Sequence, residues 1–216
     1  LVLEAGLGGR LDATTAHSWR PLIAVASIGM DHREHLGPSL KAIAAEKAAA
    51  IGEGAHVISA AQEPEVSAVL EQRINEMQGS LQWVDALDES WTLGLSGAVQ
   101  KRNGAVAAAA LQWMSARSEV ISGGAIREGF TAARWPGRLQ WMRWRGLRLR
   151  VDGAHNPPAA IELARERCGW PSAGSRQIWI LAIQAQKQAP EMLQELLDPL
   201  DEAWIVPVPG HRCWSL

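Results

Sequence analysis

The chain contains few residues of the kinds that covalent cross-links and membrane segments require. Its two cysteines, Cys168 and Cys213, lie far apart without CxxC spacing, which argues against a disulfide framework or a cysteine zinc site and suits a reducing cytoplasm. No apolar run approaches the roughly 20 residues of a membrane-spanning helix, and no signal-peptide pattern is present. The net charge of −2 over 216 residues gives no electrostatic reason to expect nucleic acid or an anionic membrane as a partner. We therefore expect a soluble, cytoplasmic, globular protein.

Two common phosphate-binding patterns are also absent. A dinucleotide fingerprint needs a third glycine where Leu11 stands, and no G-x-x-x-x-G-K-[ST] P-loop occurs anywhere in the chain. A nicotinamide oxidoreductase is therefore the function least compatible with the sequence.

The sequence does contain apolar runs that alternate with Ala-rich or amphipathic segments. The expected strands are residues 1–3, 21–28, 55–60, 81–84, 91–95, 178–183 and 203–206, and the expected helices are residues 39–51, 64–77, 103–116, 121–130, 159–168 and 190–197. Because strands that alternate with helices form parallel sheets, the chain is expected to have an α/β fold.

The opening stretch, LVLEAGLGGRLDATTAH, combines a short apolar run with a carboxylate and a glycine-rich turn. Ligands of open α/β sheets bind beyond the carboxyl ends of the strands, so Glu4 is expected to face a ligand. The glycines allow close backbone approach and positive φ. The whole string resembles the signature of folylpolyglutamate synthases and dihydrofolate synthases, which are ATP-dependent amide-forming enzymes of the Mur-ligase superfamily.

Further motifs are similar to those of the same family and imply a magnesium site. The string SIGMDHREHLG resembles its second motif, which implies that His32 and Glu4 bind one Mg²⁺ ion. The segment AAEKAAA resembles the helix in which a carbamylated lysine serves as a further metal ligand, which implies that role, and a catalytic one, for Lys47. Composition alone favours a different interpretation, in which Lys47 extends to solvent beside Glu46.

Other motifs imply a nucleotide site. Gln100 and Asn103 resemble the family's Q-x-x-N element, in which Asn103 would meet the adenine; helix capping suits Asn103 equally well. WPGRLQ and VDGAHNPPAA resemble two further motifs, which implies that Arg138 contacts the phosphates of ATP, Asp152 its ribose region, and His155 the nucleotide, with a catalytic role for His155.

Residues 139–150 alternate apolar and basic side chains, which predicts a hairpin. Its arginines could mark a nucleic-acid patch or simply a solvated strand face, and the acidic balance elsewhere in the chain favours the solvated face.

The resemblance implies an α/β architecture with two parts. Residues 1–134 would form the latter part of a parallel-sheet, Mur-ligase-type ATP-binding domain, and residues 135–216 a smaller Rossmann-like C-terminal glutamate-ligase domain. Because the chain begins at Leu1 without Met and lacks a P-loop, we expect an internal-to-C-terminal fragment that is inactive alone.

The implied function is ligation of L-glutamate to a folate or dihydropteroate carboxylate through an acyl phosphate, with ATP and Mg²⁺ as cofactors. The partners would be these small molecules, with neither nucleic acid nor membrane, and the protein would be a monomer. The alternatives are another Mur-type ligase that acts on a cell-wall precursor, and a nucleotide-binding module without catalysis.

Overall fold

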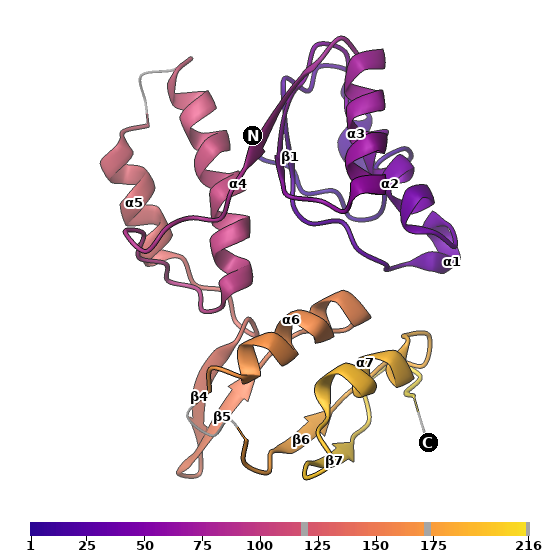
Figure 1. Cartoon of the computed structure of the whole chain (residues 1–216), viewed down its shortest axis with the longest axis vertical. Helices are drawn as coiled ribbons and strands as arrows, with labels where there is room; N and C mark the ends of the chain where they lie inside the picture. Colours follow the sequence, from indigo (N-terminus) through magenta and orange to yellow (C-terminus); the bar gives the residue numbers. More distant parts are fainter. Residues whose placement is uncertain (118–120, 171–173, 215–216) are drawn as a thin grey trace. The chain divides into compact units, whose positions relative to one another are not determined.

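The computed structural model describes residues 1–117, 121–170 and 174–214 of the chain (Figure 1). The chain divides into two compact units, Leu1–Leu139 and Gln140–Leu216. Among the described helices, none combines the length and apolar composition that crossing a lipid bilayer requires.

The first unit is built on a parallel sheet with the order β1-β2-β3. These strands are β1 (Leu22–Val25), β2 (His56–Ala60) and β3 (Ser80–Val84). The central strand β2 reads HVISA, and its last four residues are buried. A strand buried on both faces is typical of a parallel sheet that carries helices on either side.

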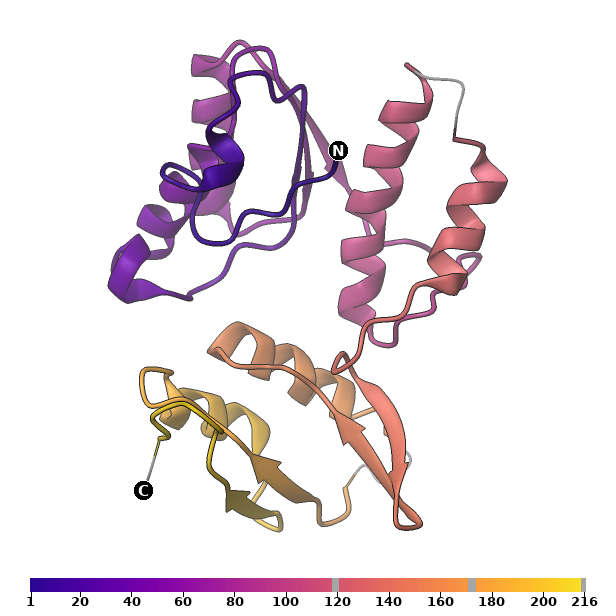
Figure 2. The same cartoon turned by 180° about the vertical axis from the view of Figure 1, so that it is seen from behind.

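Helices cover both faces of this sheet, as Figures 1 and 2 show. Val57 packs in one apolar cluster with α2 (Leu40–Ala48) and α3 (Pro64–Glu76). The next residue, Ile58, packs on the opposite face against α4 (Ala98–Ser115). Short elements complete the unit: the 3₁₀ turn η1 (Ala13–Thr15), helix α1 (Arg33–Leu36), and α5 (Gly123–Ala132), which packs on α4. The alternation of side chains along β2 thus creates a three-layer α/β unit.

The second unit starts with an antiparallel hairpin of β4 (Gln140–Trp144) and β5 (Leu147–Val151). A parallel pair follows, β6 (Ile178–Leu181) and β7 (Glu202–Ile205). Two helices, α6 (Pro157–Arg167) and α7 (Ala189–Leu196), pack on each other and bury the side chains of Ala160, Leu163, Ala189, Met192 and Leu196.

Three expectations about elements are wrong. Residues 1–3 are exposed coil, because β1 pairs with β2 and no ladder includes the opening residues. Residues 91–95 are not a strand, because Trp91 packs edge-on against Phe130 of α5 at 5.3 Å and Gly94 N donates to the Phe130 carbonyl. Helix α4 begins at Ala98 rather than at Asn103.

Candidate functional site

Asp12 organises the glycine-rich loop that follows Glu4. Its carboxylate accepts hydrogen bonds from the Gly6 and Leu7 amides and from both the amide and the hydroxyl of Thr14, at 2.7 to 3.0 Å. These bonds, with the Thr14 hydroxyl contributing most, hold the pKa of Asp12 far below its ordinary value. The carboxylate is therefore ionised at neutral pH and fixes the conformation of the loop.

The two adjacent glycines dock this loop onto helices α1 and α2. Gly8 has a φ of +67°, and a Cβ built on it would lie 2.9 Å from a Leu36 methyl of α1. A Cβ on Gly9 would lie 2.8 Å from the backbone oxygens of Glu46 and Lys47 in α2. The expected roles of these glycines, positive φ and close approach, are thereby confirmed.

Arg10 strengthens the same contact with α2. Its amide donates to the Glu46 carbonyl at 3.2 Å, and its Nε lies 3.1 Å from the Glu46 carboxylate. Glu46 therefore pairs with Arg10 in the loop. Lys47 follows in the last turn of α2, where it is half-buried.

His32 occupies a strained position directly before α1. It is the N-cap residue of that helix, with φ 50° and ψ 39° in the left-handed region, which residues other than glycine seldom adopt. Its ring nitrogens lie 3.6 Å from the Asp31 carboxylate and 3.9 Å from that of Glu34. Such strain persists where surrounding contacts enforce it and is concentrated at functional sites.

The segments that carry the three expected metal ligands therefore meet one another. The loop after Glu4 packs through Gly8 on α1, which His32 caps, and through Gly9 on the backbone of Lys47. Glu4 itself is exposed. Within the described ranges, no group of three or more His, Cys, Asp and Glu side chains forms a metal cluster. The set of Glu4, His32 and Lys47, which relies on a modified lysine, stays a prediction.

Gln62 has a positioning role that the sequence analysis missed. Its amide group accepts a hydrogen bond from Ile28 N at 2.9 Å and donates to the Ala26 carbonyl at 2.9 Å and the Ser59 hydroxyl at 3.1 Å. It thereby fastens the segment that leads to His32 to the end of β2. The available signal was a polar residue just beyond the carboxyl end of a buried strand.

Asn103 lies in the second turn of α4 and is half-buried. The N-cap of this helix is Gly97, so the interpretation of Asn103 as a capping residue is wrong. Its side-chain amide nitrogen donates to the side-chain Oε1 of Gln100 at 3.4 Å, which joins the two residues of the Q-x-x-N element.

Arg138 is exposed in the turn before buried Leu139, at the end of the first unit. Asp152 and His155 belong to the second unit, in the loop between β5 and α6. Asp152 accepts a hydrogen bond from Ala154 N at 2.8 Å, and His155 Nδ1 lies 2.9 Å from the Gly153 carbonyl. Asn156 caps α6 by accepting from Ala159 N at 2.9 Å, so this loop is fixed at both ends.

A pocket of about 410 Å³ lies between α4 and α5, with Trp91, Gln112, Ser115, Ala116, Gly123, Ile126 and Arg127 in its wall. None of the expected site residues lines this pocket. Lys47 and Asn103 lie on helices α2 and α4, and the other expected site residues lie in loops or directly before a helix.

Comparison with known proteins connects these loops to one family. No family model matches the chain. The dihydrofolate synthase/folylpolyglutamate synthase of Bacillus subtilis is 32% identical over 189 residues, which cover 76% of this chain and 43% of that protein. The Escherichia coli protein of the same name is 31% identical over 227 aligned residues, covering 98% of this chain and 52% of that protein. The chain thus spans about half the length of the curated relatives it matches.

Solved structures of the same family resemble this chain. A Mycobacterium tuberculosis folylpolyglutamate synthase complexed with ADP superposes on 98% of this chain and 52% of its own, with a TM-score of 0.83 and 25% identity. Escherichia coli FolC in complex with DHPP and ADP superposes on 98% of this chain and 53% of its own, with a TM-score of 0.81 and 28% identity. The expected α/β, Mur-ligase-type fold is confirmed, and the chain belongs to the folylpolyglutamate synthase and dihydrofolate synthase family.

Proposed function

We propose that this chain takes part in the ATP-dependent ligation of L-glutamate to the carboxylate of a folate or of dihydropteroate. The observation that carries the proposal is the 31% identity with the Escherichia coli dihydrofolate synthase/folylpolyglutamate synthase over 98% of this chain. Related structures contain ADP and DHPP, or AMPPCP and folate, which supports ATP and a pterin acid as ligands. Residues 1–134 would contribute to the ATP-binding domain and residues 135–216 to the glutamate-ligase domain.

The donor groups of the first unit fit a magnesium site. Mg²⁺ prefers carboxylate oxygens and retains water and substrate phosphate oxygens as its other ligands. Glu4 supplies an exposed carboxylate, and the His32 imidazole stands 3.6 Å from the Asp31 carboxylate in a backbone conformation that fixes its position. Glu4, His32 and carbamylated Lys47 would hold Mg²⁺, which would neutralise phosphate charge when it is bound.

Each unit carries residues that, in this proposal, contact the nucleotide. Asn103 is half-buried on α4 beside Gln100 and would contact the adenine. Arg138 carries an exposed, permanent positive charge suited to phosphate oxygens. Asp152 and His155 lie in a loop that Ala154 and Gly153 hold in shape, and they would contact the ribose region and the nucleotide.

In the proposed reaction, the substrate carboxylate attacks the γ-phosphorus of ATP and releases ADP. The amine of glutamate then attacks the acyl phosphate, loses a proton, and displaces inorganic phosphate as the amide bond forms. Catalysis of this kind depends on positioning and charge neutralisation, which the cations of Arg138 and the metal site suit. We propose that the reaction takes place in the cytoplasm and that the protein is a monomer.

The test is phosphate release by the protein from the complete reading frame, with MgATP, glutamate and dihydropteroate, repeated with tetrahydrofolate. Glutamate-dependent release with either pterin is the expected result and shows which activity is present. If a folded, ATP-binding protein released no phosphate with either pterin, the proposal would be overturned in favour of another Mur-type substrate or a nucleotide-binding module.

A further inference from the structure

The β4–β5 hairpin collects three arginines on one face. In its antiparallel register Trp141 lies opposite Arg150, and Arg143 lies opposite Arg148. Residues directly opposite one another point to the same side of a two-stranded ribbon, so these four side chains share one side. We call this side, formed by Trp141, Arg143, Arg148 and Arg150, the arginine face.

Folding of the hairpin alone does not account for this arrangement. Like charges directly opposite each other on paired strands are destabilising, and Arg143 and Arg148 form such a pair. Both are exposed. In residues 140–170 and 174–214, the arginines that form described salt bridges are Arg165, Arg167 and Arg176. The Glu166 and Asp152 carboxylates attract Arg150, so the positive charge that an anion would relieve lies at Arg143 and Arg148.

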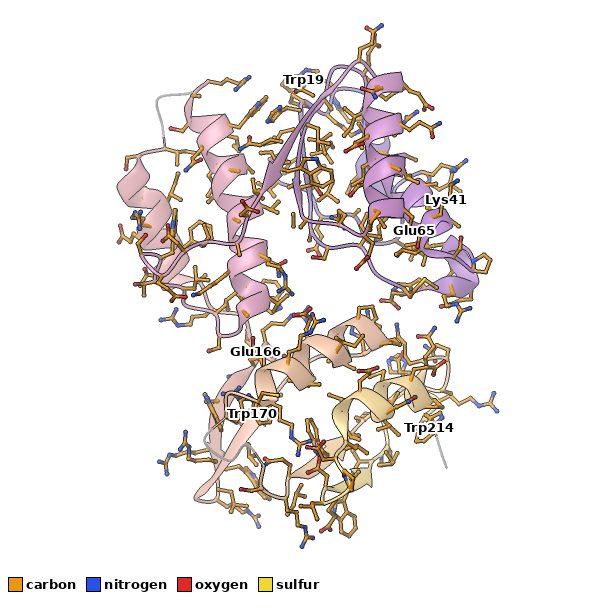
Figure 3. The ribbon with its side chains drawn as sticks, viewed as in Figure 1. Trp19, Lys41, Glu65, Glu166, Trp170 and Trp214 are labelled. Atoms are coloured by element: carbon orange, nitrogen blue, oxygen red, sulfur yellow. The ribbon has the colours of Figure 1, made fainter. Side chains whose placement is uncertain are left out.

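Tryptophan rings hold two of the three guanidinium groups of this face, those of Arg148 and Arg150, in place. The Arg150 guanidinium lies 4.1 Å from the ring centroid of Trp141 and 4.6 Å from that of Trp170, and the Arg148 guanidinium lies 4.6 Å from the Trp141 centroid. Figure 3 shows Trp170 beside the hairpin. Cation–π contact fixes a guanidinium while leaving its N–H edge available to accept an oxyanion.

The same contacts favour carboxylates over single-stranded nucleic acid. Nucleic-acid platforms need open aromatic faces on which bases stack. Here the Trp141 ring already contacts two guanidinium groups. The chain as a whole has a net charge of −2, so it lacks the broad positive field of nucleic-acid-binding proteins.

The position of the face within the second unit connects it to the proposed ligase site. Strand β5 ends at Val151 and runs directly into the loop of Asp152 and His155. Arg148 and Arg150 are same-side residues of β5 and lie about 6.6 Å apart along the strand, and Arg143 lies directly opposite Arg148. A γ-linked glutamate chain carries one free carboxylate for each residue, so it presents several anions to this group of cations.

We propose that the arginine face binds the γ-linked glutamate tail of a folate substrate, with the tail carboxylates paired to Arg143 and Arg148. The inference rests on the proposed function and adds a binding subsite to it. Arg150, wedged between two indole rings, would position the neighbouring guanidinium groups.

The experiment compares the complete protein with an R143Q/R148Q double variant and a matched R165Q/R176Q control. The control removes the same charge from exposed arginines of the same unit. Circular dichroism first establishes that each variant is folded. We expect R143Q/R148Q to raise KM for a tetraglutamyl folate about tenfold relative to KM for the monoglutamyl folate, and the control to leave that ratio unchanged. An unchanged ratio in R143Q/R148Q would overturn the proposal.

Direct titration separates this inference from the proposed function. Free oligo-γ-glutamate and a single-stranded RNA oligonucleotide are each titrated into the wild type and both double variants. Weaker oligoglutamate binding by R143Q/R148Q alone supports the subsite, even if no folate is turned over and the proposed function fails. Equal oligoglutamate binding by all three proteins, or a preference for RNA, would overturn it.

Discussion

Arg167 and Asp201 form a bidentate ion pair that is shielded from solvent. The two nitrogen–oxygen distances are 2.6 and 2.8 Å, and the two side chains are 8% and 1% exposed. Asp201 also accepts hydrogen bonds from Gln177 N, Asp198 N and Trp179 Nε1. The pair thus joins the end of α6 to the segments that precede β6 and β7, and it fixes the scaffold of the second unit.

We expect Asp201→Ala to destabilise the second unit by about 3 kcal/mol, because Arg167 loses its shielded, bidentate partner and keeps only the exposed Asp198 carboxylate at 2.8 Å. Urea denaturation followed by tryptophan fluorescence measures the loss. The control is Glu162→Ala, which removes the partner of exposed Arg165 and is expected to cost less than about 1 kcal/mol. Similar losses of unfolding free energy in the two variants would show that the shielded pair stabilises the unit no more than an exposed pair does.

The same pair predicts a pH dependence of stability. Burial by itself raises the pKa of Asp201, but the Arg167 guanidinium and the hydrogen bonds from Asp198, Gln177 and Trp179 outweigh it and lower the pKa from 3.8 to about 2. Since the folded-state pKa lies below the unfolded one, the carboxylate stabilises the fold above pH 3.8, and this contribution is lost as the pH falls towards 2.

The measurement is the urea midpoint of wild type and Asp201→Asn between pH 2 and pH 6. We expect the difference between the urea midpoints of the two proteins to narrow as the pH falls from 3.8, the ordinary pKa of the carboxyl group, to about 2, its pKa in the folded protein. A gap that stays constant over this range would contradict the assignment of the pKa to Asp201.

Gly9→Ala is expected to destabilise the first unit by about 1–3 kcal/mol, because the new methyl group would meet two backbone oxygens of α2. Gly129→Ala is the matched control, since its Cβ meets nothing within 4 Å and the residue lies inside helix α5. Alanine there should stabilise the protein by about 0.5–1 kcal/mol. Thermal melts that move in the same direction for both variants would contradict the docking of the loop on α2.

Lys47→Ala is expected to lower glutamate-dependent phosphate release by the complete protein about a hundredfold, as loss of a charge-stabilising group does. Lys41→Ala, on the exposed side of the same helix, is the control and should retain full activity (Figure 3). A carbamate signal from isotopically labelled bicarbonate should be present in the wild type and absent from Lys47→Ala. Full activity of Lys47→Ala would exclude the catalytic role.

The 216-residue chain alone is expected to show no glutamate-dependent ATP hydrolysis, because its sequence contains no P-loop to bind the nucleotide phosphates. The assay is phosphate release with MgATP, glutamate and each pterin, beside the protein from the complete reading frame. Turnover by the 216 residues themselves would refute this prediction.

Much of the secondary structure was predictable because it depends on local pattern. The apolar run around Val57 gives β2, the alternation of Trp and Arg gives the β4–β5 hairpin, and Asn156 followed by Pro157 gives the start of α6. In each case the period of side chains or a cap residue specifies the element without help from distant residues.

The failures share a physical cause. Residues 1–3 have a strand-like sequence but no ladder to join, and the apolar side chain of Trp91 packs on Phe130 rather than in the sheet. Asn103 suits a helix cap by residue type, yet the helix starts earlier at Ala98. Propensity describes what a residue tolerates, and neighbours from elsewhere in the chain select among the tolerated states.

The sequence by itself determined most of the strands and helices, the motifs, and the family to which these motifs belong. Only the tertiary structure decided that Gly8 and Gly9 bring the Glu4 loop onto α1 and α2, that Gln62 fastens the segment before His32, and that Arg167 and Asp201 find each other. The contacting residues in these relationships are 28 to 38 positions apart in the sequence, so no local pattern encodes them. They exist because burial leaves each polar group only the partners that the packed chain places within reach.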